Sequence, residues 1–298
     1  MGYRYFICDV FTDEKFSGNQ LAVFPEAQGL SEWQMQHIAK EFNFSETTFV
    51  FPSEFGHTRK VRIYTPNTEV PFAGHPNIGT AFALAQSGEF GNIGQGLQVV
   101  FEEKAGLVPV KIQRKPTGDI WCELSAPEPL SIGASVSISL VASVLSLDEL
   151  EILTTVHPPQ VASVGLPFLF VEISSVTSLL KAQIDVGKLE FLVAKAGVSY
   201  IHLYCRNVEN FDIKARMFAP LDGVFEDPAT GSANCALIGL LSQYGSPDNS
   251  NENWTISQGA ETGRPSVLYG RTQKQDGKVI GVWIGGNSVL VSEGILKI

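Results

Sequence analysis

The chain has 298 residues, of which 44% are hydrophobic and 17% charged, and its formal net charge is −10. This composition predicts a folded protein with a large apolar core and excludes a disordered chain. The 31 acidic residues against 21 Lys and Arg disfavour a nucleic-acid binder, because neutralising phosphates requires clustered basic side chains.

The beginning of the chain and its cysteines indicate a cellular setting. The first ten residues, MGYRYFICDV, contain too short an apolar run for a signal peptide. Residues 131–147 are the least charged stretch, but their serines make them unsuited to a membrane span. The four cysteines are far apart and form no CxxC pair, which disfavours a zinc site or a disulfide scaffold. We expect a protein of the reducing cytoplasm with no membrane partner.

Short strands punctuated by Gly and Pro dominate the predicted secondary structure. Strands are expected at residues 3–10, 47–51, 60–64, 107–113, 120–124, 168–173, 200–204, 215–218, 266–269, 278–284 and 289–291. A helix is predicted over residues 31–42, because Ser31 followed by Gln34 is the pattern of a capping box. The apolar side of this helix is expected to be Trp33, Ile38, Ala39 and Phe42.

Two further helices and one loop complete the predicted elements. Residues 78–86 and 233–241 are apolar nearly all round, which predicts two buried helices. Each helix is enclosed by predicted strands, so the implied unit is a helix surrounded by a sheet. Residues 248–253 are polar and are predicted to be a surface loop.

An internal repeat is the most informative feature of the sequence. The two copies are RIYTPNTEVPFAGHPNIGTA at residues 62–81 and RMFAPLDGVFEDPATGSA at residues 216–233. Arg62 matches Arg216, and the pattern Pro-x-x-Gly-[Thr/Ser]-Ala begins at Pro76 and again at Pro228. A repeat at such long spacing indicates two similar α+β halves, meeting near residues 115–130, rather than a solenoid. Coincidence between short Gly and Pro patterns is the alternative.

Both copies predict the start of a helix that can bind an anion. A proline suits the first helical position, and Asp227 or His75 stands directly before it, where an N-cap is expected. Unpaired N–H groups and the helix dipole favour a bound carboxylate there. Small residues let a ligand approach the backbone, and Ser232 adds a hydroxyl. The alternatives are that Asp227 is only a cap, His75 a turn histidine and Ser232 a packing residue.

Glu46 is a third candidate, between the first predicted helix and an apolar strand. Partial burial there would raise the pKa of its carboxyl group, which suits a group that accepts and returns a proton near neutral pH. The alternatives are a solvated glutamate at this position and three competing carboxylates, Glu69, Glu226 and Glu261.

Motifs of other chemistries are missing from the sequence. Gly-x-Ser-x-Gly, a Walker A sequence, a strand-linked GxGxxG and HExxH do not occur. The five histidines do not pair with one another at ligand spacing, so a metal site built from His75 and Asp227 is only weakly indicated. We expect neither a metal nor a cofactor.

These segments resemble the PhzF family, the phenazine-biosynthesis isomerase-like proteins, which share a duplicated fold with diaminopimelate epimerase. The similar segments are DVFTDEKFSGNQLAVF (9–24), SETTFV (45–50), TPNTEVPFAGHPNIGTA (65–81), RMFAP (216–220), EDPATGSAN (226–234) and SQGAETGRPS (257–266). The resemblance implies an α+β, diaminopimelate epimerase-like fold of two pseudo-symmetric domains. Each would be a β-sheet or barrel wrapped around a central helix, with the active site in the cleft between them. The N-terminal domain would span 1–118, with a last strand of about 287–298 returning to it, and the C-terminal domain 128–286.

The resemblance also implies cofactor-independent isomerisation of a small carboxylate-bearing substrate, with a homodimer as the possible assembly. Glu46 would move a proton between carbon atoms, and the other catalytic positions carry over to His75, Asp227 and Ser232. Substrate-binding positions carry over to Asn19, Gly74, Gly231, Ala233, Gln258 and Gly259.

Neither turn contains the catalytic cysteine that the epimerase relatives use in each half, which disfavours a two-thiol racemase. Cys235 is expected inside the second buried helix as an inert thiol. The remaining alternatives are an amino-acid epimerase or racemase with non-cysteine bases, and a catalytically silent metabolite-binding protein.

Overall fold

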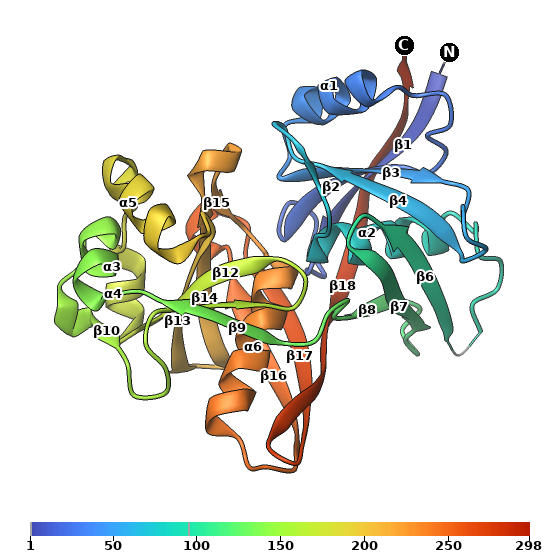
Figure 1. The fold of residues 1–298 in the computed structure, drawn as a ribbon. Coiled ribbons are helices and arrows are strands. Elements are labelled where there is room, and N and C mark those ends of the chain that lie inside the picture. Colours follow the sequence, from blue (N-terminus) through green and yellow to red (C-terminus); the bar gives the residue numbers. More distant parts are fainter. Residues whose placement is uncertain (1, 95) are drawn as a thin grey trace. The chain divides into compact units, whose positions relative to one another are not determined.

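The computed structural model describes residues 2–94 and 96–298, and the chain divides into two compact units. Unit 1 contains the residues up to Pro127 together with Ile284–Ile298, and unit 2 contains Glu128–Trp283. The long strand β18 (Lys278–Lys297) begins in unit 2 and ends in unit 1 (Figure 1).

Unit 1 is a mostly antiparallel sheet that closes around one helix. Its elements are β1 (Gly2–Val10), β2 (Asn19–Phe24), α1 (Glu32–Phe42), β3 (Glu46–Phe51), β4 (Arg59–Tyr64), β5 (Glu69–Val70), α2 (Gly74–Gln86), β6 (Leu97–Glu103), β7 (Gly106–Arg114) and β8 (Ile120–Ser125). The strands pair in the order β18–β1–β2–β3–β4–β6–β7–β8, and β8 pairs with β18 to close the ring. The β2–β3 and β4–β6 pairs are parallel.

The enclosed helix is α2, which packs against β1, β2, β3, β7 and β8. Every residue from Gly74 to Ala85 is buried, as expected for a helix without a charged side chain. Gly79 is required by this packing, because a Cβ there would lie 2.5 Å from a Leu21 methyl group and 2.7 Å from Val10.

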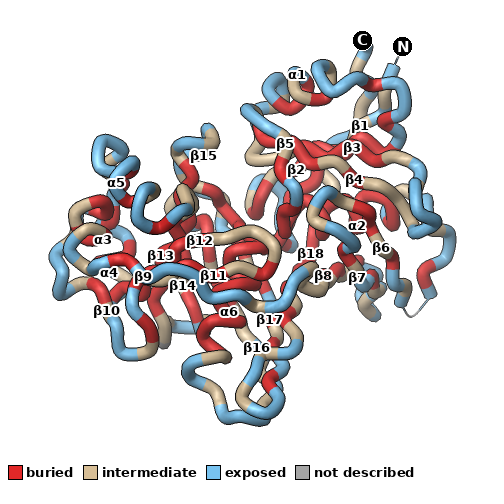
Figure 2. Tube along the Cα trace, in the orientation of Figure 1, coloured by how far each residue is buried: buried red, intermediate tan, exposed pale blue. Residues whose placement is uncertain are grey.

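Unit 2 repeats this plan with additional helices. Its elements are β9 (Ser131–Ser135), α3 (Ile138–Leu145), η1 (Glu149–Glu151), β10 (Ile152–Leu153), β11 (Gln160–Ser163), β12 (Pro167–Ile173), α4 (Val176–Lys181), α5 (Val186–Ala196), β13 (Ile201–Val208), β14 (Phe211–Ala219), η2 (Pro220–Asp222), β15 (Val224–Asp227), α6 (Gly231–Gly245), β16 (Ser250–Gln258), η3 (Ala260–Thr262) and β17 (Ser266–Gln275). The strands pair in the order β9–β11–β12–β13–β14–β16–β17, again with two parallel pairs, β12–β13 and β14–β16. Helix α6 packs against β11, β12, β16 and β17 and is buried along most of its length (Figure 2).

Several predicted elements are confirmed. The helix α1 begins with the predicted capping box, since the Ser31 hydroxyl accepts from the Gln34 N–H and the Gln34 side chain accepts from the Ser31 N–H. The two apolar helices are buried, and Cys235 lies inside α6 with no exposed surface.

Other predictions are wrong. Residues 248–253 are not all loop, because β16 begins at Ser250 and pairs with β17 along its whole length. The predicted break between residues 284 and 289 does not exist, since β18 is continuous. Trp33 is 67% exposed and stacks on His37, so it does not belong to the buried side of α1. Helices α3, α4 and α5 were not predicted.

Candidate active site

In unit 1, three of the predicted site residues lie together. Asn19 opens β2, Glu46 opens β3 and His75 is the second residue of α2. The Asn19 side-chain nitrogen lies 3.1 Å from His75 Nδ1, and Glu46 Oε2 lies 3.5 Å from the same atom. The His75 side chain is 3% exposed, whereas that of Glu46 is 18% exposed. Glu46 is therefore the member of this group that a solute can reach.

The His75 imidazole is neutral. Burial lowers its pKa to about 3, although the backbone of Gln20 counters part of this effect. The short contact with Glu46 is consequently not an ion pair at neutral pH. The roles of donor and acceptor in the Asn19–Nδ1 contact depend on the tautomer of the imidazole. His75 Nε2 is buried and makes no hydrogen bond within the described residues.

In unit 2, the predicted residues form a buried turn between β15 and α6. Asp227 is the last residue of β15, and its Oδ2 accepts a hydrogen bond of 2.6 Å from the Thr230 hydroxyl. Gln258, the last residue of β16, donates through Nε2 to the Asp227 carbonyl at 2.8 Å. Its Oε1 accepts from the Thr230 N–H at 3.1 Å. Gln258 thus holds both ends of the turn, and Ser232 follows as the second residue of α6.

Gly259 is explained by packing. Its φ is +84°, and a Cβ there would lie 2.2 Å from the Pro228 carbonyl oxygen and 2.4 Å from that of Arg264. Only glycine fits such a backbone approach.

The predicted helix starts are wrong in both units. The N-cap of α2 is Ala73 and that of α6 is Thr230, and neither side chain makes a capping hydrogen bond. Asp227 cannot be the N-cap, because it pairs with Met217 as part of β15. His75 lies inside the helix, and the prolines expected at the first position stand elsewhere, Pro76 third in α2 and Pro228 before α6.

The predicted register of the repeat is wrong as well. Counted from the helix starts, Gly74 corresponds to Gly231, and His75 corresponds to Ser232 rather than to Asp227. The fourth residue of each helix is an asparagine whose Nδ2 donates to the N-cap carbonyl, Asn77 at 2.8 Å and Asn234 at 3.0 Å.

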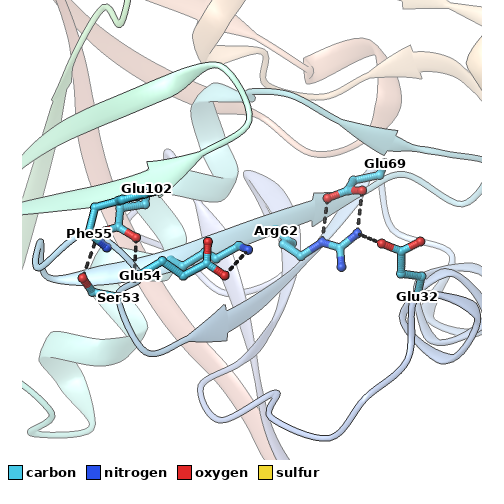
Figure 3. Close-up of polar contacts among 8 residues, drawn as sticks. Glu32, Ser53, Glu54, Phe55, Arg62, Glu69 and Glu102 are labelled. Atoms are coloured by element: carbon cyan, nitrogen blue, oxygen red, sulfur yellow. Dashed lines mark hydrogen bonds and ion pairs between the residues drawn. The ribbon is translucent and has the colours of Figure 1, made fainter.

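The preceding strands agree with this register. Arg62 of β4 makes a bidentate ion pair with Glu69 of β5, at 2.8 and 2.7 Å (Figure 3). Arg216 of β14 does the same with Glu226 of β15, at 2.8 Å twice. The segments EVPFAGHPN (69–77) and EDPATGSAN (226–234) therefore correspond, and their shared Glu, Pro, Gly and Asn could have revealed this register.

The competing carboxylates are held by cations. Burial alone would raise the pKa of Glu69, but hydrogen bonds from Arg62 and Lys104 lower it overall. Glu226 is bound by Arg216, and Glu261 lies 2.8 Å from Lys214. These contacts give the three glutamates structural roles.

A search for metal ligands and membrane spans gave the following results. Among residues 2–94 and 96–298, no group of three or more His, Cys, Asp and Glu side chains is arranged to hold a metal ion. None of the helices in this part of the chain is both long enough and apolar enough to cross a bilayer.

Comparison with known proteins identifies the family. The family described as phenazine biosynthesis-like protein, PhzC-PhzF, matches residues 8–294. The chain belongs to this family. It is 35% identical over 304 residues to an uncharacterized isomerase of Mesorhizobium japonicum, with 99% of each chain covered. It is 32% identical over 292 residues to the trans-2,3-dihydro-3-hydroxyanthranilate isomerase of Pseudomonas aeruginosa, with 98% of each chain covered.

The structural comparison agrees. A PhzF family protein of Bacillus anthracis has the same fold, with a TM-score of 0.88, 23% identity and 100% of both chains covered. The predicted PhzF resemblance, the α+β epimerase-like fold and the assignment as an enzyme are confirmed. This PhzF protein is an isomerase.

Proposed function

We propose that this PhzF protein is a cofactor-independent isomerase that moves a proton between two carbon atoms of a small carboxylate-bearing substrate. The observation that supports this best is the convergence of Asn19, Glu46 and His75 in unit 1. Glu46 combines a partly exposed side chain with a position 3.5 Å from a buried, neutral imidazole.

Glu46 performs the proton transfer in this proposal. Its carboxylate takes a proton from an acidic C–H of the substrate, and the electron pair left on carbon spreads through conjugation toward the substrate carboxylate. The neutral Glu46 then delivers a proton to another carbon on the same face, and exchange of this proton with heavy water labels the product. No atom is gained or lost, and Glu46 ends the cycle ionised. General acid–base catalysis of this kind contributes roughly 10²–10⁴-fold.

The first turn of α2 contributes to substrate binding in this proposal. His75, whose Nε2 makes no hydrogen bond within the described residues, contacts a polar atom of the substrate, and Asn19 helps to orient the imidazole. We further propose that the turn from Asp227 to Ser232 in unit 2 also takes part in substrate binding. The Ser232 hydroxyl and the free N–H groups of the first turn of α6 would stabilise negative charge as it develops. Trans-2,3-dihydro-3-hydroxyanthranilate, the compound in the name of the Pseudomonas relative, is the first substrate to test.

Proton exchange in heavy water tests the role of Glu46. We expect Glu46→Gln to lower the rate of deuterium incorporation into the substrate by at least about 10²-fold, because an amide cannot accept the proton. Incorporation is followed by NMR over a panel of small unsaturated carboxylates that begins with the compound named above.

A matched control separates this loss from a general effect of charge removal. Glu54→Gln removes a carboxylate that is 55% exposed and paired with Lys60, and it should retain the wild-type rate. Near-normal exchange in Glu46→Gln would refute the assignment. Exchange with inversion at a single carbon would instead indicate an epimerase.

A further inference from the structure

Glu103 and Gln258 occupy corresponding places in the two units. Each is the last residue of a strand that runs parallel to the strand of the ion-paired arginine, β6 beside β4 with Arg62 and β16 beside β14 with Arg216. In the register set by Arg62 and Arg216, the pairing of Lys60 with Glu102 matches that of Lys214 with Ser257. The next residue in each strand is Glu103 in unit 1 and Gln258 in unit 2.

Gln258 shows what this place requires. Its Oε1 accepts hydrogen bonds from Asn234 Nδ2 at 2.7 Å and from the Thr230 N–H at 3.1 Å. Its Nε2 donates to the Asp227 carbonyl and to the Thr230 hydroxyl. A neutral side chain with both an acceptor and a donor therefore fixes the first turn of α6.

In unit 1 the corresponding residue is Glu103, a buried carboxyl group that lies near the equivalent asparagine, Asn77. Both Glu103 oxygens and Asn77 Oδ1 are shielded from solvent and make no hydrogen bond within the described residues. Asn234 Oδ1 has a donor, His202 Nε2 at 3.2 Å, but the residue of β3 that matches His202 is Thr48, whose hydroxyl contacts Thr80 at 2.9 Å. The Glu103 carboxyl group and Asn77 Oδ1 are thus both left without a hydrogen bond, and a proton on the carboxyl group would supply the missing donor.

We infer that Glu103 is a protonated carboxylic acid that replaces the Gln258 amide in unit 1 and, through Asn77, fixes the first turn of α2. If the proposed function holds, Glu103 is a positioning residue for the reaction, because that turn contains His75. Asn77 lies close enough to influence Glu103, and burial raises the pKa of Glu103 well above its usual value, with the Asn77 side chain countering part of the rise.

The charged groups around Glu103 do not supply a cation for it. They line one hollow of about 320 Å³ and are Glu32, Glu54, Lys60, Arg62, Glu69, Glu102 and Lys104. Arg62 binds Glu69 (Figure 3). Lys104 also binds Glu69, and Lys60 binds Glu54. His75, on the helix packed behind, is neutral.

The adjacent Glu102 is a matched control, because its pKa is shifted in the opposite direction from that of Glu103. Successive residues of a strand point to opposite faces, and the Glu102 carboxylate accepts from the Ser53 hydroxyl and from the N–H groups of Glu54, Phe55 and His57. Burial opposes these contacts, but together they lower its pKa to about 2. Glu102 is held ionised where Glu103 is held neutral.

Stability as a function of pH distinguishes the two residues. Because the pKa of Glu103 is higher in the folded state than its usual 4.5, the contribution of Glu103 to the stability of wild type falls as pH rises above about 4.5. Relative to wild type, Glu103→Gln should therefore gain up to tenfold in the folding equilibrium constant per pH unit above this value, and nothing below it. Glu102→Gln should lose stability at neutral pH, and this loss should diminish as pH falls toward 2. Gln258→Glu should acquire the pH dependence that Glu103→Gln removes.

Infrared spectroscopy and activity complete the test. Wild type at pH 7 should show the carbonyl stretch of a buried protonated carboxyl group, and Glu103→Gln should lack it. Deuterium incorporation should fall in Glu103→Ala and return in Glu103→Gln, whose alkaline limit should also move to higher pH. Absence of the infrared band, or no stability gain in Glu103→Gln at pH 8, would overturn the inference. Both readouts are independent of activity, so they decide it even if Glu46→Gln disproves the proposed function or Glu103→Ala does not fold.

Discussion

The first turns of α2 and α6 occupy corresponding places in the two units, but the hydrogen bonds made by their polar side chains differ. In unit 2, Asn234 donates to Thr230 and Gln258 and accepts from His202. In unit 1, Asn77 donates to Ala73, and its Oδ1 makes no hydrogen bond within the described residues. The side chain of Asn234 thus has partners at both of its polar atoms, whereas that of Asn77 lacks one at Oδ1 unless Glu103 supplies a proton.

This difference indicates that the first turns of α2 and α6 have different roles. A fully bonded turn is rigid and suits the binding of a fixed group, whereas unpaired buried polar atoms are costly and persist where chemistry needs them. The proposed proton transfer by Glu46 belongs to unit 1, and we expect the turn of unit 2 to be the more rigid of the two.

The largest expected difference concerns the two arginines. Arg216→Met should destabilise the protein by about 3–5 kcal/mol, because it leaves Glu226 without its buried cation. It also removes donors to the carbonyls of Leu179 and Ala182. Arg62→Met should cost less than half as much, since Glu69 keeps Lys104 and the site is more exposed. Urea denaturation measures the loss of stability in both variants, and equal losses would contradict the stated difference between the two arginine sites.

The two asparagines should differ by a smaller amount. Asn234→Ala removes three hydrogen bonds and should cost about 3 kcal/mol, whereas Asn77→Ala removes the bond to Ala73 and the inferred one with Glu103 and should cost about 2 kcal/mol. Thermal unfolding of the two variants provides the measurement. A larger loss for Asn77→Ala would show that the turn of unit 1 has partners that the structure does not reveal.

His75 and His202 should have the same effect on stability in acid, but only His75 should affect the rate of the reaction directly. Burial lowers the pKa of His75 and of His202 to about 3, so below pH 6.5 the unfolded chain binds protons that the folded protein does not. Each residue should cost about 2 kcal/mol of stability between pH 7 and pH 5. His75→Gln and His202→Gln should each remove that share, but only His75→Gln should slow deuterium incorporation directly.

A result in which His202→Gln slows incorporation as much as His75→Gln, at equal stability, would remove the assigned division between the units. Comparison at matched fractions of folded protein, from circular dichroism, is the necessary control.

Local features of the sequence were sufficient for much of the fold. The capping box of α1 and the two charge-free helices depend on interactions within a few residues or on composition alone, and both were predicted correctly. The strand β16 was missed because its polar residues alternate with partly buried ones, and its backbone partners are β14 and β17, which are distant in sequence.

The sequence by itself determined the family, the α+β class, the buried helices and which residues were candidates for chemistry. Only the tertiary structure decided where the two helices start and how the two copies of the repeat align. Proline is tolerated both before a helix and within its first turn, so Pro76 and Pro228 mark no single position. The contact of Glu46 with His75, and the hydrogen bonds that distinguish Glu103 from Gln258, were likewise decided there. Strand pairing creates these contacts between residues that are far apart along the chain, and residue types alone do not specify it.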